Sequence, residues 1–123
     1  MKPRFGACCV LLCLCFTAVA FSQDAVKVDP KHYKVELENA QVRVLRVHYG
    51  PHEKSVMHSH PASVAVFLSD GKIRFTYADG KTEDVMGKNG QAQYSPAQIH
   101  NPENMGDAAF DVIVVELKGG AAK

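Results

Sequence analysis

The feature that most restricts the fold is a series of short strand-like segments separated by turns, with no convincing helical periodicity after residue 22. Residues 33–38 alternate apolar and charged side chains, which is typical of a strand with one solvated face. Residues 63–68 form an apolar run that is rich in β-branched residues and too short for an independent helix, which indicates a buried central strand. Short strands of this kind favour a single antiparallel barrel or sandwich.

Turn-forming residues divide the rest of the chain into further strands. Turn signals occur at 39–40, 69–72 and 79–80, and the last two are predicted to close β-hairpins. A loop containing His100 is predicted between Pro96 and Pro102. The remaining strand candidates are 41–49, 72–77, 81–86, 91–94 and 110–117. The apolar residues of the first of these change phase partway along, which predicts a β-bulge or a strand buried on both faces.

Residues 1–22 have the organisation of a secretory signal peptide. Lys2 and Arg4 precede an apolar stretch without charges, and small residues allow cleavage after Ala20 or, as we favour, after Ser22. The alternative is an uncleaved membrane anchor, but the apolar stretch is shorter than the roughly 20 residues that a spanning helix needs. We therefore expect an exported protein, periplasmic or extracellular, that is free of the membrane after cleavage.

Cleavage would leave a chain without thiols. All four cysteines lie in the predicted signal peptide, at Cys8, Cys9, Cys13 and Cys15, so the mature protein has no cysteine nucleophile, thiolate ligand or disulfide. Loss of the two basic residues of the signal leaves 12 basic and 13 acidic residues, a balance that argues against nucleic acid or anionic membrane as a partner. We expect a flexible leader over 23–32 and one domain over 33–118.

The pair His58 and His60 is the strongest candidate for a chemical site. Residues i and i+2 of a strand point to the same face about 7 Å apart, so two imidazoles at this spacing can chelate one ion. An isolated pair of this kind is also a common accident of sequence. Here Val56 shares the phase of the pair and an apolar strand follows directly, which places the histidines at the entrance of a buried strand. Ser59 is predicted to point to the opposite face.

His100 is the third candidate ligand. With His58 and His60 it could complete a facial set of three imidazole nitrogens. Such a set suits a divalent transition metal (iron, manganese, zinc, nickel or copper) better than calcium or magnesium, and it leaves positions open for water or substrate.

The spacing of these residues resembles that of the cupin family. Gly50, His58-Ser59-His60-Pro61 and Gly71 are similar to the first cupin motif, and Gly90, Pro96, His100 and Asn104 are similar to the second. With the flanking strands, the resemblance covers nearly all of the chain after the leader. It implies an all-β fold, a single cupin-type antiparallel β-barrel or jelly roll, which is the double-stranded β-helix.

Departures from the family pattern bear on metal binding. The first motif usually supplies a glutamate ligand three or four residues after the second histidine, where this chain has Val64 and Ala65. The second motif has Gln98 where a glycine is usual. Gln98 is the possible additional ligand, and Glu53 or His52 from the loop before the histidine pair are second choices.

These features leave three functional hypotheses. The first is a metal-dependent enzyme of the dioxygenase or isomerase type that acts on a small molecule. The alternative, which the missing glutamate favours, is a non-catalytic cupin that binds a small ligand or a partner. The third is an assembly role, in which the edge strand 33–38 pairs two copies into a homodimer. Nucleophilic and phosphate-loop chemistry lack support, because the mature chain has neither a cysteine nor a Gly-x-Ser-x-Gly or Gly-rich phosphate motif.

The other histidines, one asparagine and the strand aromatics have structural interpretations. His32 and His48 are predicted to be solvent-facing or hydrogen-bonded surface groups, and Asn104 is predicted to hold loop backbone. The aromatic residues of the strands can line a pocket but more often pack in a core; they are Phe67, Phe75, Tyr77 and Tyr94.

Overall fold

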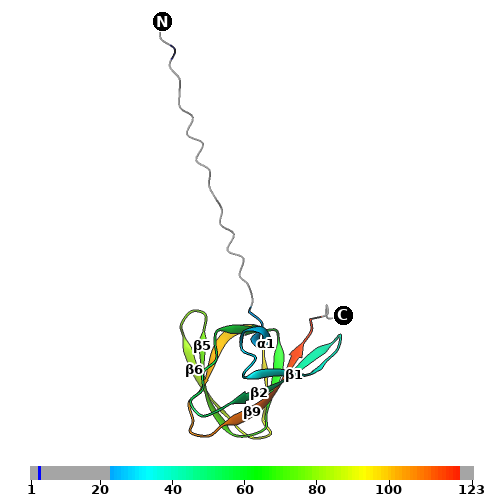
Figure 1. The fold of residues 1–123 in the computed structure, drawn as a ribbon, viewed down its shortest axis with the longest axis vertical. Coiled ribbons are helices and arrows are strands. Elements are labelled where there is room, and N and C mark those ends of the chain that lie inside the picture. Colours follow the sequence, from blue (N-terminus) through cyan, green and yellow to red (C-terminus); the bar gives the residue numbers. More distant parts are fainter. Residues whose placement is uncertain (1–2, 4–22, 120–123) are drawn as a thin grey trace.

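The described part of the computed structural model, residue 3 and residues 23–119, contains nine strands and one short helix (Figure 1). In chain order the elements are α1 (Ala25–Val28), β1 (Tyr33–Glu38), β2 (Val42–Tyr49), β3 (His58–His60), β4 (Ser63–Phe67), β5 (Gly71–Tyr77), β6 (Thr82–Gly87), β7 (Ala92–Ser95), β8 (Gln98–Asn104) and β9 (Phe110–Leu117). The predicted strands are present, and those at the two ends, β1 and β9, have the predicted bounds.

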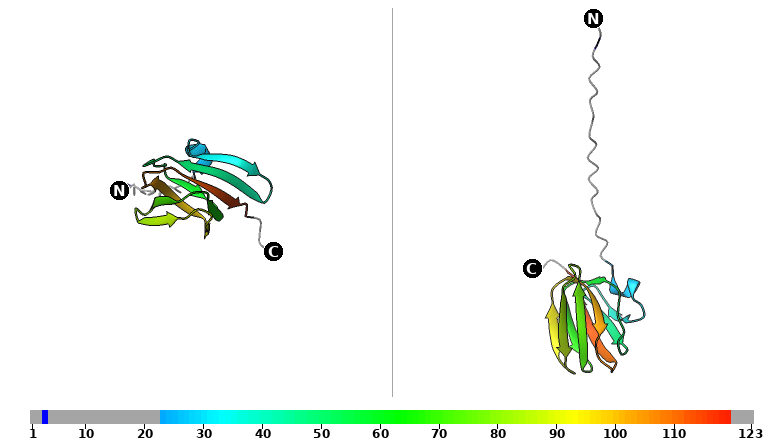
Figure 2. Two further views of the ribbon diagram at one scale, coloured as in Figure 1. Left: turned by 90° about the horizontal axis from the view of Figure 1, so that it is seen from below. Right: turned by 90° about the vertical axis from the view of Figure 1, so that its left-hand side faces the viewer.

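The strands form two antiparallel sheets that face each other across the interior (Figure 2). One sheet has the order β1-β2-β9-β4-β7 and the other has the order β3-β8-β5-β6. Neighbours in each sheet are mostly distant in sequence, as expected when a chain winds back and forth between two sheets of a jelly roll. The predicted all-β jelly roll is therefore confirmed.

The core lies between the sheets because β2 and β9 bury alternate residues. Leu45, Val47 and Tyr49 of β2 are buried, whereas the residues between them are exposed. On β9, Phe110 and Val112 are buried in the same alternating way. Each buried side chain of this size contributes about 1.5–3 kcal/mol relative to an exposed one, so the two central strands hold the sheets together.

The predicted β-bulge occurs, but in the partner strand. Val35 of β1 pairs with Leu45, and Leu37 pairs with Val44, so Glu36 is the extra residue in β1. β2 itself pairs with β9 without interruption, so the phase change in its sequence does not correspond to a bulge in that strand.

One of the two predicted hairpins is wrong. The predicted turn at 69–72 includes the first two residues of β5, and β4 and β5 belong to different sheets, so this connection carries the chain from one sheet to the other. The second prediction is confirmed, because β5 and β6 pair directly and Gly80 in their turn has a φ of 85°, a conformation that favours glycine. A turn signal in the sequence marks a change of direction and does not show which strands it joins.

The prediction of a loop around His100 is also wrong. Residues 98–104 form β8, which pairs with β3 on one side and β5 on the other. The strand tolerates Pro102 because β3 extends only as far as the residue opposite His100, so no β3 partner needs the N–H that proline lacks. The carbonyl of Pro102 still accepts a hydrogen bond from the Ser55 N–H at 2.9 Å.

The segment over 23–32 differs from the flexible leader expected from the sequence. Its helix α1 contacts β1 and β3, the edge strands of the two sheets, and Ala25 is fully buried. Ser59 of β3 donates its N–H to the Gln23 carbonyl at 2.7 Å. The segment therefore covers the gap between the two sheet edges (Figure 1). Apart from residue 3, the predicted signal peptide lies outside the described residues, and no described helix is long and apolar enough to cross a bilayer.

Candidate metal centre

The three histidines predicted to bind metal lie together inside the barrel. His58 and His60 come from β3, where the alternation of a strand points both rings inward. His100 comes from β8, directly opposite His58 in the antiparallel pair. All three are buried, with exposed fractions of 1%, 6% and 4%.

The geometry of the cluster suits a single ion. Each histidine offers one ring nitrogen, and these three nitrogens lie within 4.8 Å of one another. The ring centroids are 4.9 Å apart for His58 and His60, 5.0 Å for His58 and His100, and 5.3 Å for His60 and His100. The rings are close to perpendicular, so they converge on a common point instead of stacking.

Hydrogen bonds on the outer side set the proton positions of two of the rings. His58 Nδ1 lies 2.8 Å from the Val56 carbonyl, and His60 Nδ1 lies 2.7 Å from Oε2 of Glu116. Each acceptor requires a proton on Nδ1, which leaves Nε2 of both rings with its lone pair free. Neutral imidazoles oriented in this way are the form that binds metals.

The inner nitrogens of the cluster fit a metal because protein partners are missing. Nε2 of His58 and both ring nitrogens of His100 are buried without a hydrogen-bond partner among the described residues. A buried polar atom left unpaired costs about 1–3 kcal/mol, and such atoms are rare unless a ligand or water satisfies them. A divalent transition metal would bind Nε2 of His58 and one of the two ring nitrogens of His100.

Burial keeps two of the rings neutral. Desolvation, with a smaller effect from the neighbouring histidines, lowers the pKa of His58 to about 4 and the pKa of His100 to about 3. At neutral pH both rings are therefore unprotonated, so metal binding there requires no displacement of a proton from them.

Glu116 is a site residue that the sequence reasoning missed. It is 2% exposed, and its two oxygens bind His60 Nδ1 at 2.7 Å and Arg43 Nε at 2.6 Å. Burial raises the pKa of the Glu116 carboxyl, but the hydrogen bonds from His60 and Arg43 outweigh it and hold the pKa below its usual value. The sequence does contain a signal that Glu116 faces inward, because it shares the strand phase of Phe110 and Val112, which are buried.

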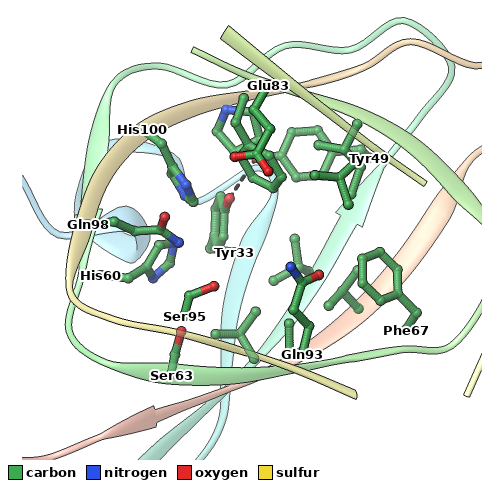
Figure 3. Close-up of a pocket in the computed structure, with 18 of the residues that line it drawn as sticks. Tyr33, Tyr49, His60, Ser63, Phe67, Glu83, Gln93, Ser95, Gln98 and His100 are labelled. Atoms are coloured by element: carbon green, nitrogen blue, oxygen red, sulfur yellow. Dashed lines mark hydrogen bonds between the residues drawn. The ribbon is translucent and has the colours of Figure 1, made fainter. Parts of the chain in front are cut away.

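The three further ligand candidates have different positions. Gln98 pairs with His60 in register and lines the same cavity (Figure 3). Glu53 instead binds Lys31 and His32, and His52 is exposed and binds Asp107. Only Gln98 therefore remains beside the histidines.

The predicted roles of the other polar residues are mostly confirmed. Asn104 is buried, and its side chain donates to the carbonyls of Gly50 and Ala108, both at 2.9 Å. His48 is exposed and hydrogen-bonds Asp111, as expected. The surface position predicted for His32 is wrong, because this residue is only 5% exposed.

A cavity of about 340 Å³ opens beside the histidines (Figure 3). Its walls include the aromatic residues Phe67, Phe75 and Tyr77, and Phe75 stacks on His100 with the ring centroids 4.9 Å apart. Tyr94 is 63% exposed and does not line it. Ala65, at one of the two positions where the cupin resemblance implies a glutamate, lines the wall without contributing a polar atom.

Comparisons with known proteins agree with this architecture. A cupin domain from Bordetella pertussis has 22% identity and a TM-score of 0.66, with 71% of this chain and 92% of that chain covered. A double-stranded β-helix protein from Klebsiella pneumoniae has 25% identity and a TM-score of 0.58, with 73% and 78% covered. The polyketide cyclase RemF from Streptomyces resistomycificus has 16% identity and a TM-score of 0.54, with 73% and 66% covered. No curated protein matches. The family model described as "Cupin domain" matches residues 45–116, more than half of the sequence, and this chain therefore belongs to the cupin domain family.

Proposed function

We propose that this protein binds one divalent transition metal through His58, His60 and His100 and uses the adjacent cavity to bind a small, uncharged molecule. The observation that carries the proposal is the cluster of buried inner nitrogens that lack any partner among the described residues. Imidazole ligands suit zinc, iron, nickel, copper and manganese, and the donor set does not select one of them.

The lining of the cavity supports an uncharged, partly aromatic ligand. It contains no lysine or arginine among the described residues, and its one carboxylate, Glu83, accepts a hydrogen bond from the Tyr77 hydroxyl at 2.7 Å. The polar groups that line the cavity beside the histidines are neutral and include Gln98, Ser95 and Ser63 (Figure 3). A volume of about 340 Å³ is at the lower end for ligand pockets, so the ligand must be small.

The residues that line the cavity also bear on whether the protein is a catalyst or a binding protein. A bound metal would act as a Lewis acid or oxygen-binding centre, as a dioxygenase or isomerase requires. The protein's own residues hold the rings in place and provide apolar walls that keep bulk water away. The lining carboxylate, Glu83, is at an exposed position and accepts a hydrogen bond from Tyr77. Glu116, which contacts His60, is also bound to Arg43, so both carboxylates near the histidines are already engaged. This observation favours metal-dependent binding as the alternative to catalysis.

Metal titration of the purified protein tests the proposal. The protein is stripped with a chelator and titrated with Zn²⁺, Ni²⁺ and Co²⁺, with the cobalt absorption spectrum reporting coordination by nitrogen. We expect one ion per chain, and no binding by His58→Ala or His100→Ala. His48→Ala is the matched control, since His48 is exposed, pairs with Asp111 and is not one of the three clustered histidines, and it should bind like the parent. A parent protein that takes up no ion at micromolar supply would refute the proposal.

Small probe molecules test the ligand class. Phenol should raise the melting temperature of the metal-loaded protein more than benzenesulfonate, which has a similar ring and a negative charge, because binding to the folded state stabilises it. Ala65→Phe should abolish this shift by filling the cavity while leaving metal content unchanged. An equal response to both probes would contradict an uncharged ligand.

Export is proposed from residues 1–22 alone. Cell fractionation followed by N-terminal sequencing should find the protein outside the cytoplasm with Phe21 or Gln23 as its first residue. A cytoplasmic protein that retains Met1 would contradict this proposal.

A further inference from the structure

We propose that Glu116 is a positioning residue for the metal site, held in place by Arg43 and, through Arg43, by Asp24 of the N-terminal segment. This inference rests on the proposed metal-binding function and names the residues that orient one ligand. It assigns a role to a buried carboxylate that lies on β9, outside both histidine motifs.

Each oxygen of Glu116 already accepts a hydrogen bond from a neighbouring side chain. Oε2 accepts from His60 Nδ1 at 2.7 Å, and Oε1 accepts from Arg43 Nε at 2.6 Å. The carboxylate is also absent from the group of ligand atoms that lie within 4.8 Å of one another, which contains only the three histidines. Glu116 therefore acts on the site through His60, by keeping the proton on Nδ1 and the lone pair on Nε2.

The strand registers explain why Glu116 reaches His60. On β9, the central strand of the five-stranded sheet, it pairs with Arg43 of β2 on one side and with Ser63 of β4 on the other. Ser63 follows β3 after only a short connection, which brings the end of β3 against this part of β9. The buried carboxylate thereby links the sheet without metal ligands to the sheet that carries all three.

Arg43 is in turn fixed by the N-terminal segment. Its two terminal nitrogens both contact the carboxylate of Asp24, one of them at 3.2 Å, while its Nε is committed to Glu116. Asp24 also forms a β-bridge with Ser59, the residue between the two histidines of β3. The segment that follows the predicted signal peptide thus contacts the metal site from outside at two points.

A simple structural ion pair is the competing explanation, and the geometry argues against it. An ion pair needs only Arg43 and one carboxylate. Asp24 already supplies that carboxylate, and its side chain is more exposed than that of Glu116. Burial of a second carboxylate is costly unless its oxygens are all used. Here the second oxygen is used by a candidate metal ligand, in the arrangement by which outer carboxylates orient histidines in metal sites.

The test is Glu116→Gln, which keeps the size and removes the charge. The amide has one oxygen for two donors, so its NH₂ group must face either Arg43 or His60. We expect affinity for Zn²⁺ to fall about 10–100-fold, the usual effect of removing an outer-shell partner. Glu116→Asp, which restores the charge, should recover part of the loss, and Asp24→Asn should give a smaller loss than Glu116→Gln. Parent-like affinity in Glu116→Gln would overturn the proposal.

The matched control is Glu36→Gln. Glu36 forms a cross-strand pair with Arg46, in which Nε donates at 2.9 Å, but this pair is about half exposed and contacts no histidine. Its substitution should leave Zn²⁺ affinity unchanged. If both glutamate variants lower the affinity equally, Glu116 has no specific role.

A readout on the metal-free protein separates this inference from the proposed function. The nitrogen chemical shifts of the His60 ring should show the proton on Nδ1 in the parent and a shift toward Nε2 in Glu116→Gln. If the parent binds no metal, the proposed function fails, but this measurement still decides whether Glu116 positions His60. An unchanged tautomer would overturn the inference. If Glu116→Gln does not fold, the nitrogen chemical shifts of the His60 ring are measured on Asp24→Asn instead. An unchanged ratio of the two His60 tautomers in Asp24→Asn would count against the inference.

Discussion

Two regions of the barrel bury histidines, and they differ in how the ring nitrogens are used. His32 is 5% exposed and stacks on Tyr49, with the ring centroids 4.3 Å apart. Its Nδ1 contacts Asp29 and its Nε2 contacts Glu53, each at 2.7 Å. In the three-histidine cluster the rings are equally buried, but three of the ring nitrogens lack a partner among the described residues. Burial alone therefore does not identify a ligand; an unpaired nitrogen does.

The surrounding charges reinforce the difference. His32 lies between two carboxylates, and hydrogen bonds from Lys31 and His32 lower the pKa of Glu53 to about 2. In the cluster, burial lowers the pKa of His100 to about 3, and the carboxylate that reaches the cluster, Glu116, is shared between His60 and Arg43. The first environment surrounds an imidazole with hydrogen-bonding carboxylates, whereas the second keeps His58 and His100 neutral through burial. One is suited to a structural role and the other to metal coordination.

The largest effect expected from this comparison is on stability at His32. The His32→Ala substitution leaves Asp29, which is buried, without its imidazole partner, and removal of one member of a buried pair is strongly destabilising. Because Asp29 keeps the Ser55 hydroxyl, we expect the free energy of unfolding to fall by about 3 kcal/mol, at the lower end of the usual range. Urea unfolding measures the change, and metal stoichiometry should remain that of the parent. A loss of bound metal would show that the two regions are not separate.

At His100 we expect a substitution to raise the free energy of unfolding of the metal-free protein. The His100→Phe substitution removes two unpaired buried nitrogens and keeps a ring that can stack on Phe75. The metal-free variant should be more stable than the metal-free parent by about 1–2 kcal/mol, measured by urea unfolding, while metal binding is lost. A destabilised variant would indicate that the nitrogens of His100 already have partners and that the contrast with His32 is unsound.

Local pattern was enough to predict the histidine pair but not its surroundings. Because side chains alternate along a strand, the positions of His58 and His60 in the sequence are enough to predict that the two rings share a face. His100 joins the site as a third imidazole, which the cupin resemblance supports, but its strand is predicted as a loop because Pro96 and Pro102 bracket it. Whether a proline breaks a strand depends on which partner strand lies beside it, and this is a long-range property.

The missed residues have the same cause. Glu116 is 56 residues away from His60 in sequence, and its role arises only when β9 lies between β2 and β4. His32 is predicted at the surface because it lies among alternating strand residues. In the fold, two polar residues, Asp29 and the more distant Glu53, turn inward as its partners. Polar residues that satisfy one another in the interior resemble surface residues in a sequence.

A third prediction concerns acid, and its expected effect is smaller. The unfolded chain protonates His100 near pH 6.5, whereas the folded, metal-free protein does so only near pH 3. The stability that comes with neutral His100 is thus present above pH 6.5 and is lost as the pH falls from 6.5 toward 3. Between pH 7.5 and 5.5 the metal-free parent should lose about 1 kcal/mol more than His100→Phe, in unfolding titrations of both proteins. Equal losses would mean that the pKa of His100 is near its ordinary value.

The smallest effect is expected at Ser55, where the two regions meet. Its hydroxyl donates to Asp29 of the His32 region, and its oxygen lies 3.3 Å from Nδ1 of His58. His58 keeps its shorter bond to the Val56 carbonyl at 2.8 Å when the hydroxyl is removed, so the orientation of the ring is largely preserved. Ser55→Ala should therefore weaken Zn²⁺ binding only about threefold, or about 0.6 kcal/mol, by competition titration.

A double-mutant cycle tests whether the two regions are independent. Combined with His32→Ala, Ser55→Ala should give an additive change in metal affinity. A coupling free energy well above about 0.6 kcal/mol would show that the His32 region influences the metal site through Ser55. The structural region and the metal-binding region could then no longer be treated as separate.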